Sequence, residues 1–263
     1  MIQPTTKEAY ALFHEGSLTL ADMERHGIHV DVPRLRGNIQ EVVNQITNNQ
    51  RELRNDKVWS DWRRVFGRKA NLDSHPQLAH IMFEVLKYKS PGKTEKGTRH
   101  RSDEAAFDGV DLPFIKTYFK TQKLVKAKQV LQLIDKETID GYLHPFQHLT
   151  GGDDEEGGAI TYRGSSSSPN FHNMPIRNPT IGRMIRECII PPEGWCMPEV
   201  DFGAVEFCGA ACFWRDQGMV EYASDPSKDI HKDYAGHSYW CERDQVSKPM
   251  RAVAKNKFVF PVL

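Results

Sequence analysis

The sequence predicts an α+β fold in which a helical region precedes a region of short extended segments. Apolar residues recur at helical spacing from Glu8 to about Leu143. From His144 onward the segments are shorter, and Gly, Pro and Ser interrupt them. With 263 residues and 39% hydrophobic content, the chain can bury a substantial core. We therefore expect regions of different character, with a boundary near residue 145.

The first region contains two helices whose ends are marked in the sequence. Ser74-His-Pro-Gln77 combines a capping Ser with Pro in the first turn, which predicts a helix start before an apolar run. A second long helix is predicted from about Pro113 to Asp135. Between them, Lys87 to Arg101 is rich in Lys, Gly, Thr and Ser, which is typical of a mobile basic loop.

The second region alternates predicted turns, strands and helices. Gly151 to Gly158 has the composition of a hairpin-like or flexible insertion. Met197 to Phe202 is predicted to form a strand, and Gly203 to Arg215 the helix that follows it. Ser247 begins another helix, because Pro follows it within the first helical turn.

The charge distribution matters more than the total, since 35 Lys and Arg balance 35 Asp and Glu. Affinity for nucleic acid would therefore require local clusters of cations. Basic residues do gather between Lys87 and Lys128, whereas Asp153 to Glu156 is an acidic run. An ordinary solvated basic face would have the same composition, so charge alone leaves both interpretations open.

Cysteine usage argues against a secreted, disulfide-bonded protein. The five cysteines all lie in the C-terminal half, and no CxxC occurs. No secretory signal pattern opens the chain, and no apolar run approaches the ~18 residues that a membrane helix needs. These features predict a soluble, cytoplasmic protein.

A zinc site is one alternative use of the cysteines and histidines. His231, His237 and Cys241 could combine with Cys208 and Cys212, which are four residues apart. No compact paired-ligand spacing supports that site, so Cys208 and Cys212 are expected in the core.

Three further residues carry charges suited to phosphate chemistry. Asp201 ends an apolar segment, where a carboxylate could bind a hard cation or simply cap the next helix. Arg251 and Lys255 are four residues apart, so two cations would lie on one helical face and could reach along a polyphosphate. An isolated pair of this kind is equally compatible with a solvated face.

Four motifs follow one another in the second half of the chain. They are Thr161-Tyr-Arg-Gly-Ser-Ser-Ser-Ser-Pro-Asn-Phe-His-Asn-Met-Pro-Ile-Arg177, Val200-Asp-Phe-Gly-Ala-Val-Glu206, Asp229-Ile-His231 and Arg251-Ala-Val-Ala-Lys255. In this order and at these separations they resemble the polymerase core of phage-like or bacterial family A (DNA polymerase I type) enzymes. Leu20 to Asp31, Asn71 to Leu78 and the helix around Lys123 to Lys126 extend the resemblance to about residue 14.

The resemblance implies an incomplete right-hand polymerase architecture. Residues 1–145 would form a thumb-like helical DNA-gripping region, and residues 146–224 the first half of an antiparallel-sheet palm with the Asp201 motif. Residues 225–263 would begin the fingers, with a truncated nucleotide-binding helix. The family's second set of catalytic carboxylates lies further downstream. We therefore expect a C-terminal polymerase half as a partner, either a separate chain or a missing segment, in a bacterial or phage-infected cell.

The resemblance also assigns site residues. Asp201 would be catalytic and, with the backbone carbonyl of Phe202, would bind Mg²⁺. The expected nucleotide-binding residues are Arg177, Glu206, His231, Arg251, Lys255 and Phe260. Glu206 would exclude a ribose 2′-hydroxyl. The expected DNA-binding residues are Arg163, Asn170 and His172 in the minor groove, and Lys93, Lys96, Arg99, Lys116, Lys120 and Lys123 on phosphates.

The motifs depart from the family pattern at several positions. His172 stands where Gln is usual, Phe202 to Val205 replace Tyr-Ser-Gln-Ile, and Cys208 stands where Arg is common. Phe260-Pro261 replaces Phe-Gly and lies one position late relative to Lys255. Regular helical spacing would place Phe258 on the Lys255 face, so Phe260 fits only if the helix contains a one-residue bulge.

The expected activity is template-directed DNA synthesis, adding dNTPs to a primer 3′-hydroxyl by two-metal phosphoryl transfer. This chain would be the N-terminal portion and would need its C-terminal complement. A noncatalytic primer-template binding subunit or an inactive fragment is an alternative. An RNA polymerase of the related single-subunit type is a third, which Glu206 and the thumb resemblance disfavour.

Overall fold

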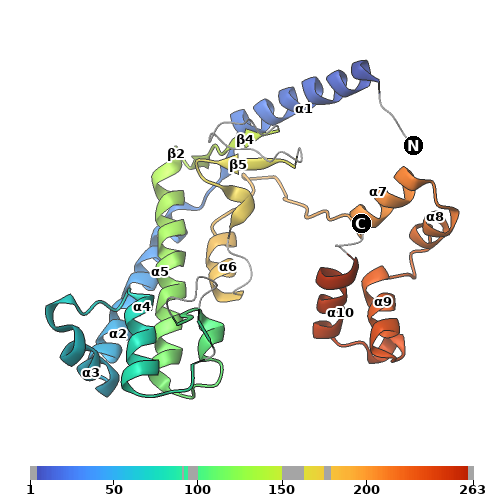
Figure 1. Cartoon of the computed structure of the whole chain (residues 1–263). Coiled ribbons are helices and arrows are strands. Elements are labelled where there is room, and N and C mark those ends of the chain that lie inside the picture. The colour runs from blue at the N-terminus through green and yellow to red at the C-terminus, as the bar shows by residue number, and fades with distance from the viewer. Residues whose placement is uncertain (1–4, 91, 94–99, 150–162, 175–178, 260–263) are drawn as a thin grey trace. The chain divides into compact units, whose positions relative to one another are not determined.

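The computed structural model describes residues 5–90, 92–93, 100–149, 163–174 and 179–259 (Figure 1). The chain divides into two compact units. The larger unit is Phe13–Met197, and the smaller unit combines Met1–Leu12 with Pro198–Leu263.

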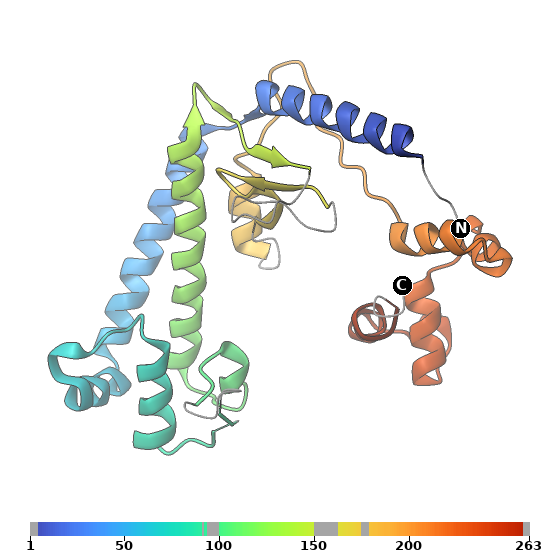
Figure 2. The ribbon, with the colours of Figure 1, turned by 45° about the horizontal axis from the view of Figure 1, so that its top comes forward.

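The framework of the larger unit is a pair of long helices, α2 (Val32–Asn55) and α5 (Pro113–Glu137). Figures 1 and 2 show them side by side and running in opposite directions. Asp31 caps α2 by accepting a hydrogen bond from the Arg34 backbone N–H at 3.0 Å. The apolar faces of the two helices share one buried cluster, which includes Leu35, Val42, Ile46, Leu124, Leu131 and Ile134.

Several short helices cover the end of this pair at which α2 ends and α5 begins. They are α3 (Lys57–Phe66), η1 (Gly67–Lys69), α4 (His75–Ala79), η2 (His80–Val85) and η3 (Glu104–Phe107). Their buried side chains surround Trp62, which has no solvent exposure, and we call them the Trp62 cluster. The Trp62 indole N–H donates to the Gln77 side-chain oxygen at 2.8 Å. A polar side chain thus satisfies the one polar atom of this buried ring.

The predicted helix starts and the predicted long helix are confirmed in this unit. Ser74 caps α4 by accepting a hydrogen bond from the Gln77 backbone N–H at 3.4 Å. The helix predicted from Pro113 to Asp135 is α5. α4 continues directly into η2, which is a π-helical turn. The N-terminal helix α1 (Thr6–His26) is also present, but none of its residues is buried.

Two small antiparallel sheets lie beside the helices. β1 (Ile28–His29), β2 (Thr138–Ile139) and β3 (Tyr142–Leu143) form a sheet with the order β1-β3-β2. β4 (Phe146–His148) pairs with β5 (Ser165–Ser167), with Gln147 opposite Ser166. The chain then passes through η4 (Phe171–Asn173) to α6 (Pro179–Arg186), which packs against α2 and α5.

The smaller unit consists of two helix pairs. α7 (Val205–Trp214) packs against α8 (Gln217–Ser224), and α9 (Ile230–Tyr239) packs against α10 (Lys248–Ala254). Ser247 caps α10, as predicted, and η5 (Arg243–Gln245) connects α9 to it. α10 continues into a second π-helical turn, η6 (Lys255–Val259). The Tyr222 hydroxyl of α8 donates a hydrogen bond to Asp233 of α9, which joins the two pairs.

The strand predicted at Met197 to Phe202 is wrong. This segment has no strand pairing, and Val200 and Phe202 are 81% and 77% exposed. An extended segment becomes a strand only when a neighbour satisfies its backbone N–H and C=O groups. Neither of the two sheets of the described residues includes it. The following helix begins at Val205, two residues later than predicted.

The expectation that Cys208 and Cys212 lie in the core is also wrong, since Cys208 is half-buried and Cys212 is exposed. The buried face of α7 passes through Phe207 and Ala211 instead. Those positions precede the cysteines by one residue, a rotation of ~100° around the helix axis. Of the five cysteines, Cys188 is buried.

The architecture confirms the α+β prediction, because most described residues are helical and the sheets are small and antiparallel. None of the described helices is both long and apolar enough to cross a membrane. The insertion predicted at Gly151 to Gly158 lies outside the described residues.

Candidate functional site

Asp229 connects the two helices that carry most of the predicted nucleotide-binding residues. It is the N-cap of α9, and its Oδ1 accepts hydrogen bonds from the backbone N–H groups of His231 and Lys232, both at 3.1 Å. Arg251 of α10 donates from Nε to Oδ2 at 3.0 Å and from Nη2 to Oδ1 at 3.2 Å. This bidentate pairing fixes the plane of the guanidinium group.

The Asp229 carboxylate remains ionised in this setting. Burial by itself raises its pKa, but the hydrogen bonds from Arg251 and from the backbone of Lys232 and His231 outweigh burial and lower the pKa below its usual value. At neutral pH an ionised carboxylate therefore faces Arg251.

His231 lies at the centre of the same group of charges and is only 7% exposed. Burial lowers its pKa, and the positive charges of Arg251 and Lys255 lower it further. The negative charges of Asp229 and Glu206 act in the opposite direction. Three other predicted nucleotide-binding residues, Glu206, Arg251 and Lys255, are therefore within electrostatic reach of His231. Two fixed cations beside a neutral imidazole can bind a polyphosphate.

The end of the α10 helix contains the irregularity that the sequence required. Lys255 begins the π-helical turn η6, which adds one residue to the helical repeat. Ala254 and Val259, five residues apart, are both buried, while Phe258 is 41% exposed and its ring lies 5.7 Å from that of Tyr234. The one-residue bulge is thus present, although Phe260 itself lies outside the described residues.

Asp201 is exposed in the extended segment that precedes α7. It makes no hydrogen bond or ion pair with any described residue, and Phe202 beside it is also exposed. Glu206, the second residue of α7, is exposed as well. A single carboxylate and a backbone carbonyl are hard oxygen donors that fit part of a Mg²⁺ coordination shell. No group of three or more His, Cys, Asp or Glu suited to a metal ion occurs among the described residues.

The residues predicted to contact the minor groove lie around β5. Arg163 is exposed two residues before this strand, and Asn170 and His172 are exposed after it. The His172 Nδ1 lies 3.1 Å from the Gly164 carbonyl oxygen, so the segments on both sides of β5 meet. The Ser166 hydroxyl accepts hydrogen bonds from the backbone N–H groups of Phe171 and His172 at 2.9 and 3.2 Å, which holds the turn in place. Arg177 lies outside the described residues.

The basic face of α5 is partly neutralised by acids. Lys116, Lys120 and Lys123 recur at helical spacing and are all exposed. Lys116 pairs with Asp111 at 2.5 Å and Lys123 with Glu104 at 2.7 Å. Among the described residues, Lys120 has no ion-pair partner.

The predicted basic loop is described only at its ends. Lys93 is exposed at the start of the loop and forms a β-bridge with His100. Lys96 and Arg99 lie outside the described residues. Of the three loop cations that were predicted to bind DNA, the structure therefore describes the position of one, Lys93.

Sequence reasoning missed Asp229 as a site residue. Its signal was present, since an Asp directly before a helix is a common N-cap. Its pairing with Arg251, 22 residues later, could not be read from the local pattern. Only the packing of α9 on α10 brings them together.

The sequence model of the family described as DNA polymerase family A matches residues 40–263. The chain belongs to this family. It is 29% identical over 246 residues to the thermostable DNA polymerase I of Thermus aquaticus. It is 27% identical over 240 residues to DNA polymerase I of Mycobacterium tuberculosis.

A solved structure agrees with this assignment to family A. The POL domain of Pol1 from M. smegmatis, in complex with DNA primer-template and dNTP, matches 90% of this chain with a TM-score of 0.70 and 26% identity. The match spans 39% of that domain's chain, and the two relatives above are covered over 27% and 25% of their length. The fold described here is therefore that of part of a family A polymerase domain, as the sequence predicted.

Proposed function

We propose that this chain contributes the primer-gripping and dNTP-binding portion of a DNA-directed DNA polymerase. The observation that carries the proposal is the group formed by His231 on α9, Arg251 on α10 and Lys255 at the start of η6, inside the region that matches the family. A C-terminal polymerase portion, as a separate or continuing chain, would complete the site.

In this proposal the triphosphate of the incoming nucleotide binds between α9 and α10. Asp229 occupies two donor positions of Arg251 and leaves the remaining guanidinium N–H groups for phosphate oxygens. His231 and Lys255 add further donors, and Arg177 and Phe260 would complete the nucleotide site. Glu206 would occupy the space that a ribose 2′-hydroxyl needs.

Asp201 and the carbonyl of Phe202 would hold Mg²⁺ together with carboxylates from the C-terminal portion. Two bound Mg²⁺ ions would activate the primer 3′-hydroxyl and stabilise the leaving pyrophosphate. The contribution of this chain is an exposed carboxylate without a competing described partner, which is accessible to both metal and primer.

Residues 1–145 would grip the duplex in a thumb-like manner, with residues 146–224 and 225–263 forming the start of a palm and of fingers. The cations expected on DNA phosphates are Lys93, Lys96, Arg99, Lys116, Lys120 and Lys123. Such contacts position DNA without reading its sequence. Arg163, Asn170 and His172 would instead test base-pair geometry in the minor groove, whose acceptors are similar in all base pairs.

A second candidate function is a noncatalytic primer-template binding subunit, or an inactive fragment. One observation favours it: the described residues contain no group of three or more His, Cys, Asp or Glu that could hold a metal ion. In that case the cationic surfaces would bind DNA while Asp201 coordinates nothing.

Primer extension with dNTPs and Mg²⁺ distinguishes the two functions. We would combine this chain with a polypeptide that supplies the C-terminal portion and test Asp201→Ala, with each chain alone alongside. Extension that requires both chains and disappears in Asp201→Ala supports the polymerase. Tight primer-template binding without extension supports the binding subunit. Substituting rNTPs for dNTPs, with Glu206→Ala as the variant, tests the RNA polymerase alternative, for which rNTPs would be used by the wild type.

The DNA contact can be tested on this chain alone. Lys120→Ala should reduce the slope of log affinity against log salt concentration by ~0.9, since one phosphate contact would be lost. Lys116→Ala, on the same helical face, should reduce the slope by less, because Lys116 is already paired with Asp111 at 2.5 Å. Equal slopes for wild type and Lys120→Ala would remove Lys120 from the DNA contact.

A further inference from the structure

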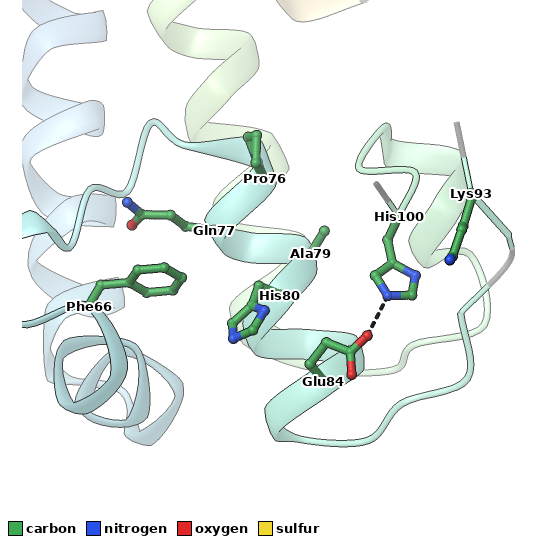
Figure 3. A pocket seen from close by; sticks show the side chains of 8 residues that line it. All are labelled: Phe66, Pro76, Gln77, Ala79, His80, Glu84, Lys93 and His100. Atoms are coloured by element: carbon green, nitrogen blue, oxygen red, sulfur yellow. Dashed lines mark hydrogen bonds and ion pairs between the residues drawn. The ribbon is translucent and has the colours of Figure 1, made fainter. Parts of the chain in front are cut away.

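The larger unit has a pocket of about 480 Å³ between the helix formed by α4 and η2 and the ends of the basic loop. Figure 3 shows two of its lining residues, Glu84 and His100, pointing toward each other, with Lys93 beside His100. His80, from the same helix as Glu84, lies against Phe66 with ring centroids 5.5 Å apart. The two histidines of the pocket therefore have different partners.

Both nitrogens of His100 are engaged. Its Nε2 lies 2.6 Å from the Glu84 Oε1 and donates to that carboxylate. Its Nδ1 lies 2.8 Å from the Ser90 hydroxyl, which can accept from or donate to the ring. The hydrogen bond with His100 lowers the pKa of Glu84, so this acceptor stays ionised at neutral pH. The imidazole also contacts the Phe83 ring at 5.4 Å.

These contacts join the two ends of the basic loop. His100 forms the β-bridge with Lys93, and the Arg101 backbone N–H donates to the Gly92 carbonyl at 3.2 Å. His75, at the start of α4, anchors the next residue through its Nδ1, 3.1 Å from the Ser102 carbonyl oxygen. The base of the loop is thus attached to the helix at two points.

The chain reaches this arrangement by reversing direction at the end of η2. Lys87 adopts the left-handed conformation, with φ of 59°, and the Tyr88 backbone N–H donates to the Met82 carbonyl at 3.0 Å. A left-handed residue is usual where a helix ends, and the hydrogen bond here spans one residue more than usual because η2 is a π-helical turn. It returns Ser90 toward Glu84, where the two residues bind the same imidazole from opposite sides.

We propose that His100 is a positioning residue for DNA binding, which clamps the base of the basic loop to the helix through Glu84 and Ser90. This inference rests on the proposed DNA contact of the larger unit. The loop carries several cations that repel one another, and closing it costs conformational entropy. Because the clamp holds the base of the loop together before DNA binds, this cost is not added to the cost of binding. The clamp also fixes the direction in which Lys93 faces solvent. Arg101, in contrast, is already paired with Asp103 at 2.6 Å.

The test is binding of a fluorescein-labelled primer-template duplex, followed by anisotropy over a series of NaCl concentrations. His100→Ala should weaken binding ~3- to 10-fold at low salt and lower the salt slope by ~1, because the phosphate contact of Lys93 would be lost. His80→Ala is the matched control, since it removes the neighbouring histidine of the same pocket. It should bind as the wild type does.

Two variants of Glu84 distinguish the effect of the clamp from the effect of removing a negative charge. Glu84→Gln and Glu84→Ala remove the same negative charge, which by itself should favour DNA binding. Gln keeps an oxygen that can accept from the His100 N–H, whereas Ala does not. We expect Glu84→Ala to reduce the salt slope as His100→Ala does, and Glu84→Gln to keep the wild-type slope.

The outcomes separate this inference from the proposed function. Wild-type affinity and slope in both His100→Ala and Glu84→Ala would overturn the clamp, provided that Lys93→Ala or Lys120→Ala still lowers the slope. Absence of salt-dependent duplex binding by the wild type would overturn both proposals. In the His100→Ala background, Lys93→Ala should have little further effect if His100 acts through the loop.

Discussion

The Trp62 cluster and the smaller unit show two ways of holding helices together. The Trp62 cluster buries large side chains completely, among them Trp62, Tyr118 and Met82. In the smaller unit the most completely buried apolar residues are alanines, while aromatic residues such as Trp214 and Trp240 are 69% and 94% exposed. We therefore expect helix caps and ion pairs, such as that of Asp229, to contribute more to the stability of the smaller unit than they do in the Trp62 cluster. The difference places apolar packing in the proposed DNA grip and polar contacts in the proposed nucleotide site.

Among the variants that test this contrast, Trp62→Ala should change the free energy of unfolding most. Removing a fully buried ring leaves a cavity and should lower the free energy of unfolding by about 3–5 kcal/mol. Trp240→Ala, in the smaller unit, should change it by less than about 0.5 kcal/mol because its ring is solvated. Urea unfolding followed by circular dichroism measures both. Similar losses in the two variants would show that the exposed aromatic residues are in fact packed.

Asp229→Ala tests whether polar contacts stabilise the smaller unit. It removes the α9 cap and the partner of Arg251, so the unit should lose about 2–3 kcal/mol. Asp216→Ala, which removes a simple cap of α8 at Met219, should cost only about 1 kcal/mol. Urea unfolding of the two variants measures both losses. Equal losses would mean that the Arg251 pairing adds nothing to the cap.

His231 gives the smaller unit a pH dependence. Its pKa is lowered in the folded state, first by burial and then by Arg251 and Lys255, so the unfolded chain takes up a proton more readily. Stability is therefore complete above the ordinary value of 6.5 and declines as pH falls from there toward the folded pKa.

His231→Phe should remove this decline, while His237→Gln, a change on the exposed side of α9, should retain it. Melting temperatures of the smaller unit's helices between pH 8 and about pH 5 measure the effect. A decline that persists in His231→Phe would assign the titration to another group.

The smallest effect is expected at the helix end in the larger unit. Lys87 has a φ of 59°, a conformation that costs an L-residue more than it costs glycine. Lys87→Gly should stabilise the larger unit by about 0.5–1 kcal/mol, measured as a rise in melting temperature. Lys89→Gly is the control, because its φ is not positive and glycine there gains nothing. A loss of stability in Lys87→Gly would mean that the Lys side chain contributes more than its backbone strain costs.

Local chemistry determined which parts of the fold the sequence could predict. The caps at Ser74 and Ser247 lie within a few residues of the groups that they bind, so both helix starts were predictable. The strand at Met197 to Phe202 was not, because a strand depends on a neighbouring segment that its own residues do not specify. The prediction that Cys212 is buried failed for a related reason. On α7, neighbouring residues lie on different faces, so an error of one position exchanges a buried residue for an exposed one.

The same distinction applies to the site. The spacing of Arg251 and Lys255 predicted a cationic helix face, and the structure adds that His231 lies within reach of both charges. The role of Asp229 and the clamp at His100 depend on residues 22 and 16 positions away. Such pairs form only when the segments that carry them pack against one another, so no local sequence pattern predicts them.

The π-helical turn at Lys255–Val259 bears on how this helix tolerates insertions and deletions. Because the turn holds one residue more than an α-helical turn, Val259 reaches the buried side five positions after Ala254. A chain with one residue fewer between them could close the same span with an ordinary turn and still bury both ends. The change would be absorbed locally, and α10 with its Arg251 would stay where it is. The number of residues in this helical turn can therefore vary by one while Arg251, in the turn before it, keeps its place.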